Sequence, residues 1–196
     1  HRQSSAASDV YKRQPMSSQK ELALDTARTL RGAGHLVYFA GGAVRDQLRG
    51  IEPKDYDLAT SATPTEVLAL FPKSDAVGEH FGVIIVKGQR EMIEITTFRT
   101  DGSYKDGRRP ESVEFSSSEE DAQRRDFTIN GLFQDPFSGK IIDHVGGKTD
   151  LETGTLRAIG DPKKRFQEDA LRLMRAIRFS VVIGFKIEEE TLDALK

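Results

Sequence analysis

Two aspartates one residue apart are the first candidates for chemistry in this sequence. Asp55 and Asp57 lie in the segment KDYDLAT, directly after the turn-like GIEP. In an extended strand, residues two apart point to the same face, so the two carboxylates would lie side by side. Each would then make the other harder to ionise. Such a pair belongs either to a solvated turn or to a site for a doubly charged cation.

The aspartate pair has the ligand chemistry of a magnesium site. Mg²⁺ prefers hard oxygen ligands and is commonly held by one or two carboxylates together with substrate phosphates. Glu94, in the strand-like segment IEITTF, would add a third carboxylate. Two such ions can clamp the attacking and leaving oxygens of an in-line displacement at phosphorus. Mn²⁺ suits the same oxygen ligands, so the sequence does not separate the two metals.

A glycine turn upstream of the aspartates is a candidate phosphate-binding element. Gly41 and Gly42, in GGAVRD, lie between a predicted strand and a predicted helix, where they allow close backbone approach to an anion. Arg45, one turn into that helix, would add a bidentate contact to a phosphate. The alternative is a tight turn followed by a surface arginine. A short glycine turn alone favours the second interpretation, but its place a few residues upstream favours a metal site over a solvated turn at Asp55 and Asp57.

Arginines near the end of a predicted helix form a second basic group. Arg124 and Arg125 lie in RRDF, where Asp126 could orient one of them. A cation pair that only complements the helix dipole is an equally good interpretation.

The segment RFQEDALRLMRAIRF suggests a site for a nucleobase. On a continuous helix, Asp169 and Arg172 would lie one turn apart on one face, and Arg175 and Arg178 would continue it. A carboxylate beside a guanidinium presents acceptors and donors that could hydrogen-bond the edge of a base. The apolar residues at 171, 174 and 177 predict a separate stripe that faces the core.

The elements expected around these residues alternate between helices and strands. Helices are predicted over 17–34, 41–50, 63–72, 116–135 and 161–179, and strands over 35–40, 55–60 and 113–116. Residues 82–99 read as a hairpin, 100–112 as a mobile loop, and 139–160 as strand, turn and strand.

Composition limits the function classes. The 196-residue chain has no cysteine, which excludes disulfides and thiolate metal sites and suits a reducing cytoplasm. No apolar run is long enough to predict a membrane span. The net charge of −2 means that a polyanion must be bound by local clusters. Residues 1–15 are polar and aperiodic, and are expected to be a disordered or non-native leader.

Six segments occur in one order: GGAVRD, DYDLAT, IEITTFR, DGSYKDGRRP, RRDFTINGL and DPKKRFQEDALRLMRAIRF. Together they resemble the class II tRNA nucleotidyltransferases, the CCA-adding enzymes and their relatives the bacterial poly(A) polymerases. The resemblance implies an α+β fold, with a polymerase beta-like nucleotidyltransferase head built on a small mixed sheet flanked by helices. The head would cover 16–160, and 161–196 would begin an all-helical neck that could form a homodimer. The tRNA-binding body and tail are expected to be missing.

The resemblance also implies a role for each candidate residue. Asp55 and Asp57 would hold the catalytic magnesium ions, with Glu94 as a third catalytic carboxylate. The incoming triphosphate would be contacted by Gly41, Gly42, Arg45, Arg124 and Arg125. The base of CTP or ATP would be read by Asp169 and Arg172, with support from Arg175 and Arg178. A flexible specificity loop would contain Asp101, Tyr104, Asp106 and Arg109.

The implied activity is template-independent addition of CMP and AMP to the 3′ end of tRNA. An A-adding enzyme or a bacterial poly(A) polymerase is the alternative within the enzyme class, whereas the intact DGSYKDGRRP segment disfavours an enzyme that adds only CC. A non-catalytic nucleotide- or RNA-binding module is the alternative from another class. It is disfavoured because both repelling aspartates are present. No GxGxxG follows the first strand, which argues against a dinucleotide-binding dehydrogenase.

Overall fold

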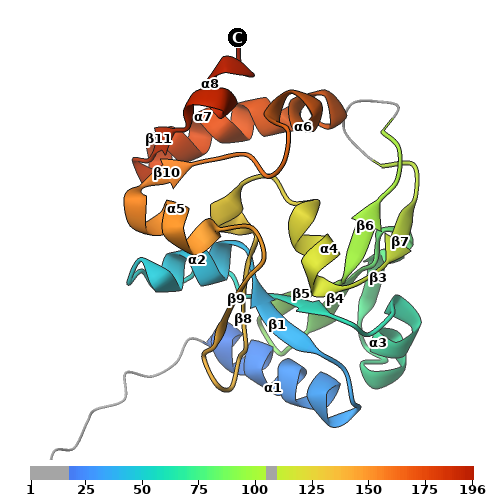
Figure 1. Ribbon diagram of the computed structural model, residues 1–196. Coiled ribbons are helices and arrows are strands. Elements are labelled where there is room, and N and C mark those ends of the chain that lie inside the picture. The colour runs from blue at the N-terminus through green and yellow to red at the C-terminus, as the bar shows by residue number, and fades with distance from the viewer. Residues whose placement is uncertain (1–17, 105–109) are drawn as a thin grey trace, which may run out of the picture.

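A seven-stranded mixed sheet is the base of the computed structural model, which describes residues 18–104 and 110–196 (Figure 1). The strand order is β3-β4-β5-β2-β1-β8-β9, in which only the β2–β5 pair is parallel. The strands are β1 Val37–Ala40, β2 Asp57–Thr60, β3 Asp75–Gly78, β4 Val83–Lys87, β5 Met92–Thr97, β8 Leu132–Gln134 and β9 Ile141–Asp143. This arrangement confirms the predicted mixed sheet flanked by helices.

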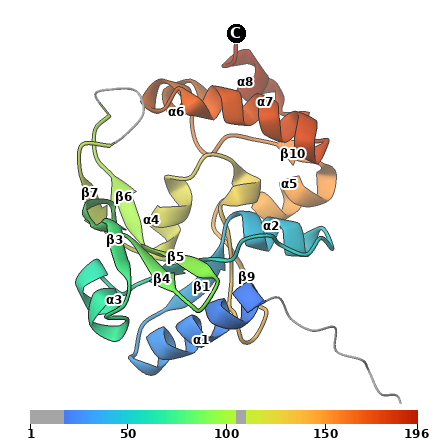
Figure 2. The ribbon, with the colours of Figure 1, turned by 180° about the vertical axis from the view of Figure 1, so that it is seen from behind.

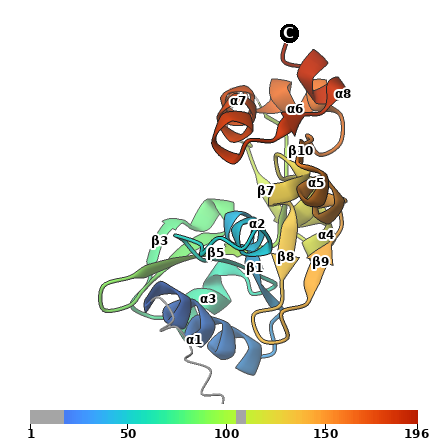
Figure 3. The same ribbon diagram turned by 90° about the vertical axis from the view of Figure 1, so that its left-hand side faces the viewer.

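Helices cover both faces of the sheet (Figure 3). Helix α1 (Ser18–Gly32) packs on β1, β2 and β5, and α3 (Pro64–Leu70) packs on α1 and β4. Helix α4 (Ser118–Gln123) contributes Ala122 to the smaller core on the opposite face. Helix α2 (Gly42–Leu48) follows β1 and packs at the β1–β8 side of the sheet.

Local sequence signals explain where the helices α3 and α4 begin. Each starts with a capping box, in which the cap side chain and a glutamate three residues later satisfy each other's backbone N–H groups. The pairs are Thr63 with Glu66 and Ser117 with Glu120. Pro64 occupies the first turn of α3, where its missing N–H costs nothing.

A second layer of helices lies beside this sheet (Figures 1 and 2). Its elements are α5 Gly147–Thr153, β10 Thr155–Leu156, α6 Pro162–Glu168, α7 Leu171–Ile183, β11 Lys186–Ile187 and α8 Glu189–Asp193. Phe127 and Ile129, around the 3₁₀ turn η2 (Thr128–Asn130), pack with Phe179 of α7 in a second buried cluster. Because this cluster draws residues from both sides of position 160, it ties the two layers together. The domain boundary after residue 160 stays a prediction.

Residues 161–179 form two helices, where a single one was predicted. The chain leaves helical geometry at Asp169, which has φ −142° and ψ 104° and ends α6. The Asp169 carboxylate then accepts a hydrogen bond from the backbone N–H of Leu171 at 2.9 Å, at the start of α7. A side chain that can cap a helix competes with helix continuation, which accounts for the break.

The apolar stripe of α7 faces solvent, so the predicted core-facing orientation is wrong. Leu171, Met174 and Ile177 are 47%, 67% and 52% exposed. The buried face instead carries Ala176 and Phe179. Periodicity identified an amphipathic helix but could not say that arginines would line the inner side.

Three further segments differ from the prediction. The helix expected over 116–135 ends at Gln123 and is followed by η2 and β8. The segment 139–160 contains α5 where only a turn was expected. The start of the loop expected over 100–112 belongs to β6 (Arg99–Asp101), which pairs with β7 (Val113–Phe115), the strand predicted over 113–116. A short 3₁₀ turn η1 (Glu79–Phe81) precedes β4.

Gly147 is predicted to be essential to the contact between α5 and η2. A Cβ at this position would overlap the carbonyl group of Thr128, whose carbon lies 2.8 Å away. Gly147→Ala should therefore lower the free energy of unfolding by about 2 kcal/mol or more, measured by urea denaturation. Gly32→Ala is the matched control, because a Cβ at that position would have no atom within 4 Å. Equal stability of the two variants would contradict the packing described.

Candidate active site

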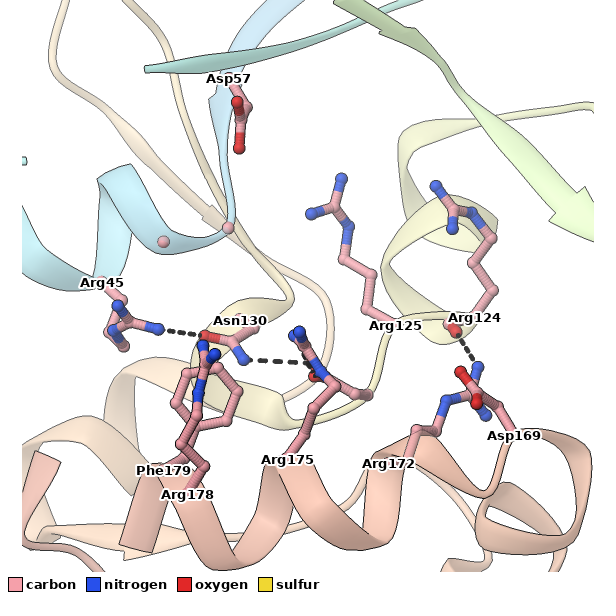
Figure 4. Close-up of a pocket in the computed structure, with 13 residues that line it drawn as sticks. Arg45, Asp57, Arg124, Arg125, Asn130, Asp169, Arg172, Arg175, Arg178 and Phe179 are labelled. Atoms are coloured by element: carbon pink, nitrogen blue, oxygen red, sulfur yellow. Dashed lines mark hydrogen bonds and ion pairs between the residues drawn. The ribbon is translucent and has the colours of Figure 1, made fainter. Parts of the chain in front are cut away.

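A cavity of about 450 Å³ lies between the sheet and α7 (Figure 4). Its wall brings together all nine of the predicted nucleotide-binding residues with one of the two aspartates. The predicted residues in the wall are Gly41, Gly42, Arg45, Asp57, Arg124, Arg125, Asp169, Arg172, Arg175 and Arg178. Six arginines against the three aspartates Asp57, Asp126 and Asp169 make this wall strongly cationic.

The glycine turn holds its arginine inside the cavity. Gly41 has φ 62°, a conformation that favours glycine, and α2 begins at Gly42. Arg45 donates to Asn130 Oδ1 and to Asp46 Oδ1, both at 2.8 Å. Because α2 has only seven residues, the arginine rather than the helix end supplies most of the positive charge.

Two carboxylates, those of Asp57 and Glu94, lie on the neighbouring strands β2 and β5. Leu58 of β2 is the register partner of Ile95 of β5 in this parallel pair. Asp57 and Glu94 each come one residue earlier, so their side chains point to the same face of the sheet. Both line a second cavity of about 200 Å³. Asp55 lies just before β2, and Tyr56, the residue between the two aspartates, is fully buried. The alternation expected of Asp55 and Asp57 is present, although the strand itself begins at Asp57.

Asp57 carries the electrostatic cost of this arrangement. Removal from water, followed by repulsion from Glu94 and Asp55, raises the pKa of Asp57 from 3.8 to about 6, and Arg125 opposes this shift. The group is therefore harder to ionise than an ordinary aspartate until a cation approaches.

Arg124 and Arg125 are oriented by Asp121, and the predicted role of Asp126 in this is wrong. Arg124 Nε donates to Asp121 Oδ1 at 2.9 Å, and Arg125 Nη2 donates to Oδ2 at 2.9 Å. Burial of Asp121 acts against its ionisation, but Arg125 and Arg124 outweigh it and hold its pKa below the usual range. Figure 4 shows Arg125 extending from the end of α4 toward Asp57.

Arg172 is buried, and its guanidinium group donates to two backbone carbonyls and one carboxylate. Its Nη1 donates to the Arg165 carbonyl and to Glu168 Oε2, and its Nη2 donates to the Arg124 carbonyl. The carboxylate paired with Arg172 is that of Glu168, whereas Asp169 was expected to be its neighbour on the helix. Of the five guanidinium N–H groups, Nε–H and one on Nη2 have no partner among the described residues. Those donors and the second Asp169 oxygen remain available at the cavity wall.

Three of the arginines lie close to one aromatic ring. The guanidinium carbons of Arg45, Arg175 and Arg178 lie 5.3, 5.1 and 5.3 Å from the centroid of the Phe179 ring. Cations within about 6 Å of an aromatic face are attracted by the ring quadrupole. Arg175 also donates to Asp126 Oδ2 at 2.7 Å. These contacts connect α7 to the glycine turn and to the segment that follows α4.

The proposed specificity loop is only partly described. Asp101 closes β6, and Tyr104 donates its hydroxyl to Asp101 Oδ2 at 2.6 Å. The Tyr104 ring lies 5.9 Å from the Arg172 guanidinium. Asp106 and Arg109 lie outside the described residues.

Asp121, Asn130 and Phe179 belong to the site but were not predicted from the sequence. Asp121 looked like one of several acids in the first turn of a helix. Asn130 was assigned to the interior of a helix, and Phe179 was only the last residue of the helix predicted over 161–179. These residues contact arginines from other segments of the chain. Such contacts depend on the fold, and the spacing of residues along the sequence does not show them.

The donor set fits a hard divalent cation in part. Asp57 and Glu94 offer only oxygen ligands on one cavity wall, and their repulsion would be relieved by a cation. Within 18–104 and 110–196 no three acidic or histidine side chains converge closely enough to form a complete metal site. A bound ion would therefore need oxygens from substrate phosphates, as is usual for Mg²⁺.

Comparisons with known proteins agree with this geometry. The model of the Poly A polymerase head domain family matches residues 37–157. The chain belongs to this family. The resemblance inferred from the six segments is thus confirmed.

Individual curated proteins are also similar to this chain in sequence. A CCA-adding enzyme of Bacillus pumilus is 50% identical over 175 residues, which are 89% of this chain and 44% of the relative. The enzyme of Bacillus subtilis is 47% identical over 174 residues, with 88% and 44% covered. The chain thus spans less than half the length of these curated relatives.

No helix in the described part of the chain is long and apolar enough to cross a membrane.

Two solved structures share the fold. The Bacillus stearothermophilus CCA-adding enzyme in complex with CTP is 43% identical, with a TM-score of 0.82 over 91% of this chain and 43% of that one. A Thermotoga maritima CCA-adding enzyme complexed with tRNA is 29% identical, with a TM-score of 0.73 over 89% of this chain and 40% of that one.

Asp57→Asn is predicted to stabilise the metal-free protein at neutral pH. The pKa of the Asp57 carboxyl is higher in the folded state than in the unfolded state, so ionisation of this group destabilises the fold. The protein is therefore more stable below the unfolded pKa, and this extra stability is lost as the pH rises through about 6. The variant should gain on the order of 1 kcal/mol at about pH 7.5, reduced by solvent screening, and nothing below about pH 4. Thermal melts across this range, with exposed Asp25→Asn as control, test it. An advantage that persists at low pH would contradict the assigned cause.

Proposed function

We propose that this chain is the nucleotide-binding and catalytic part of a CCA-adding tRNA nucleotidyltransferase. Its substrates would be CTP, ATP and the 3′ end of tRNA. The observation that carries the proposal is the convergence of Asp57 and six arginines on one cavity, in a chain that belongs to the Poly A polymerase head domain family. The named relatives that bind CTP and tRNA support the same assignment.

The cationic wall suits a nucleoside triphosphate. Arg45 and Arg125, with the glycine turn, lie on the side of the cavity that Asp57 adjoins. Guanidinium groups bind phosphate oxygens through charge-assisted, bidentate hydrogen bonds. Preorganised cations at phosphates also stabilise charge that builds up during transfer, because they need not reorient in the transition state.

Asp57 and Glu94, with Asp55 beside them, would hold the magnesium ions, and Mn²⁺ could replace Mg²⁺. Bound there, the metal would lower the pKa of the RNA 3′-hydroxyl and stabilise the departing pyrophosphate. The protein side chains orient the α-phosphate next to the carboxylates. Arg125 places a positive charge beside Asp57 and limits the repulsion among the acids.

Asp169 and Arg172 explain a preference for cytosine and adenine. Both bases present an exocyclic amine next to an unprotonated ring nitrogen, which is a donor beside an acceptor. Uracil and guanine present a carbonyl next to a ring N–H, the reverse order. The free Asp169 oxygen can accept from the amine, and the free Arg172 donors can bond the ring nitrogen.

An A-adding enzyme or a poly(A) polymerase is the second candidate. The edge formed by Asp169 and Arg172 would also serve an enzyme that uses only ATP, and the matching family model is that of a poly(A) polymerase head domain. The order in which nucleotides are added separates the two candidates.

Extension of a tRNA that ends at its discriminator base is the direct test. With Mg²⁺, CTP alone should add CC, and CTP with ATP should add CCA, as read at single-nucleotide resolution. Asp55→Ala/Asp57→Ala should abolish addition while the protein stays folded, because the metal ligands are lost. Extension with ATP only, on a tRNA that already ends in CC, would favour the A-adding alternative. Failure to bind either nucleotide would contradict the proposal.

Asp169→Asn is predicted to relax base selection without unfolding the protein. The amide can still cap α7, but it can present a donor as well as an acceptor to the base. Incorporation of UMP relative to CMP should rise about tenfold or more, the size expected when a charge-assisted hydrogen bond stops discriminating. Exposed Asp193→Asn in α8 is the matched control. Unchanged selectivity would remove Asp169 from base recognition.

A further inference from the structure

Asn130 lies between two charged groups of the cavity wall. Its side-chain oxygen Oδ1 accepts a hydrogen bond from Arg45 Nη1 at 2.8 Å (Figure 4). Its side-chain nitrogen Nδ2 donates to Asp126 Oδ1 at 3.1 Å, and Asp126 Oδ2 accepts from Arg175 Nε at 2.7 Å. The four side chains thus form one hydrogen-bonded chain that runs from α2 to α7.

The two neighbours fix the orientation of the Asn130 amide. A guanidinium group only donates hydrogen bonds, and a carboxylate only accepts them. The amide oxygen must therefore face Arg45, and the amide nitrogen must face Asp126. A carboxylate at position 130 would repel Asp126, and an ammonium group there would repel Arg45. An uncharged side chain with both an acceptor and a donor satisfies both neighbours.

Asn130 is placed firmly enough to restrain Arg45. The residue is 6% exposed, and its backbone N–H donates to the Phe127 carbonyl at 2.9 Å. Arg45 receives two hydrogen-bonding partners among the described residues, and one of them, Asp46, is its own neighbour in the short helix α2. The hydrogen bond to Asn130 is therefore the one that fixes the guanidinium relative to another segment of the chain.

This support leaves Arg45 able to bind an anion. Asn130 adds no negative charge, and the two hydrogen bonds use only Nε–H and one N–H of Nη1. The three other N–H groups of the guanidinium have no hydrogen-bond partner within 18–104 and 110–196. Nη2 lies 3.7 Å from the position of a Cβ at Gly42, so free donors adjoin the glycine turn.

We propose that Asn130 is a positioning residue that fixes the Arg45 guanidinium for the phosphates of the incoming nucleotide. The inference rests on the proposed function, in which Arg45 and the glycine turn bind those phosphates. Asn130 acts through Arg45 and has no contact of its own with the nucleotide. A long side chain that is already ordered loses less conformational entropy when the ligand binds, so the affinity for the triphosphate rises.

A double-mutant cycle on CTP binding tests the inference. Affinity for CTP in the presence of Mg²⁺ is measured by calorimetry for the parent chain, Asn130→Ala, Arg45→Met and the variant with both changes. Asn130→Ala should weaken CTP binding by about three- to tenfold in the parent chain. With Arg45→Met present, the same change should alter the affinity by no more than about 1.5-fold, because no guanidinium remains to be positioned.

Asn130→Ser is the second variant, since loss of a buried amide also affects folding. Its hydroxyl offers one polar atom in place of two, so its loss of CTP affinity should be smaller than that of Asn130→Ala and should also disappear with Arg45→Met. Melting temperatures of all variants are measured alongside.

The outcomes separate positioning from a structural role. An equal loss of CTP affinity with and without Arg45 would mean that Asn130 supports the fold or contacts the nucleotide itself, and would overturn the inference. Unchanged CTP affinity in Asn130→Ala would also overturn it. Failure of the parent chain to bind CTP would contradict the proposed function, and this inference with it, whereas additive effects would leave the proposed function intact.

Discussion

Mutual repulsion among arginines is the constraint on which the site depends. Six guanidinium groups line one cavity, and they can stay there only because neighbouring groups offset their charge. Asp121 holds Arg124 and Arg125, and Glu168 holds Arg172. Removing one partner from a buried ion pair costs about 3–5 kcal/mol, because it leaves the other charge uncompensated. The supporting acids therefore matter as much as the arginines that face the cavity.

The same constraint explains why two layers of the molecule have to pack closely. Arg172 on α7 donates to the carbonyl of Arg124, and Arg175 pairs with Asp126 on the segment after α4. Phe179 then places its ring among arginines from α2 and α7. The cavity is thus an interface between the sheet layer and the helical layer. Any ligand that neutralises the wall would also strengthen the contact between the two layers.

Sequence reasoning succeeded where chemistry is local and failed where it depends on packing. Asp57 and Glu94 could be picked out from the sequence as neighbours, because they lie at matched positions of β2 and β5 and line one cavity. Asp55 precedes β2, and the catalytic role of all three carboxylates stays a prediction. The capping role of Asp169 could not be predicted, since a charged run reads as one helix until the chain is seen to turn. The outward apolar face of α7 was missed for a related reason. Amphipathic spacing defines two faces, but only the arginine partners show which one is buried, as Arg172 illustrates.

Calorimetric titration of the chain with CTP, CMP and cytidine, in the presence of Mg²⁺, tests the central claim most directly. If the arginine wall exists to bind a triphosphate, affinity should rise steeply from cytidine to CMP to CTP, and the gain should shrink as salt is added. Equal affinity for CTP and cytidine would contradict the account. It would mean that the six arginines are fully neutralised within the fold and leave no charge for a nucleotide.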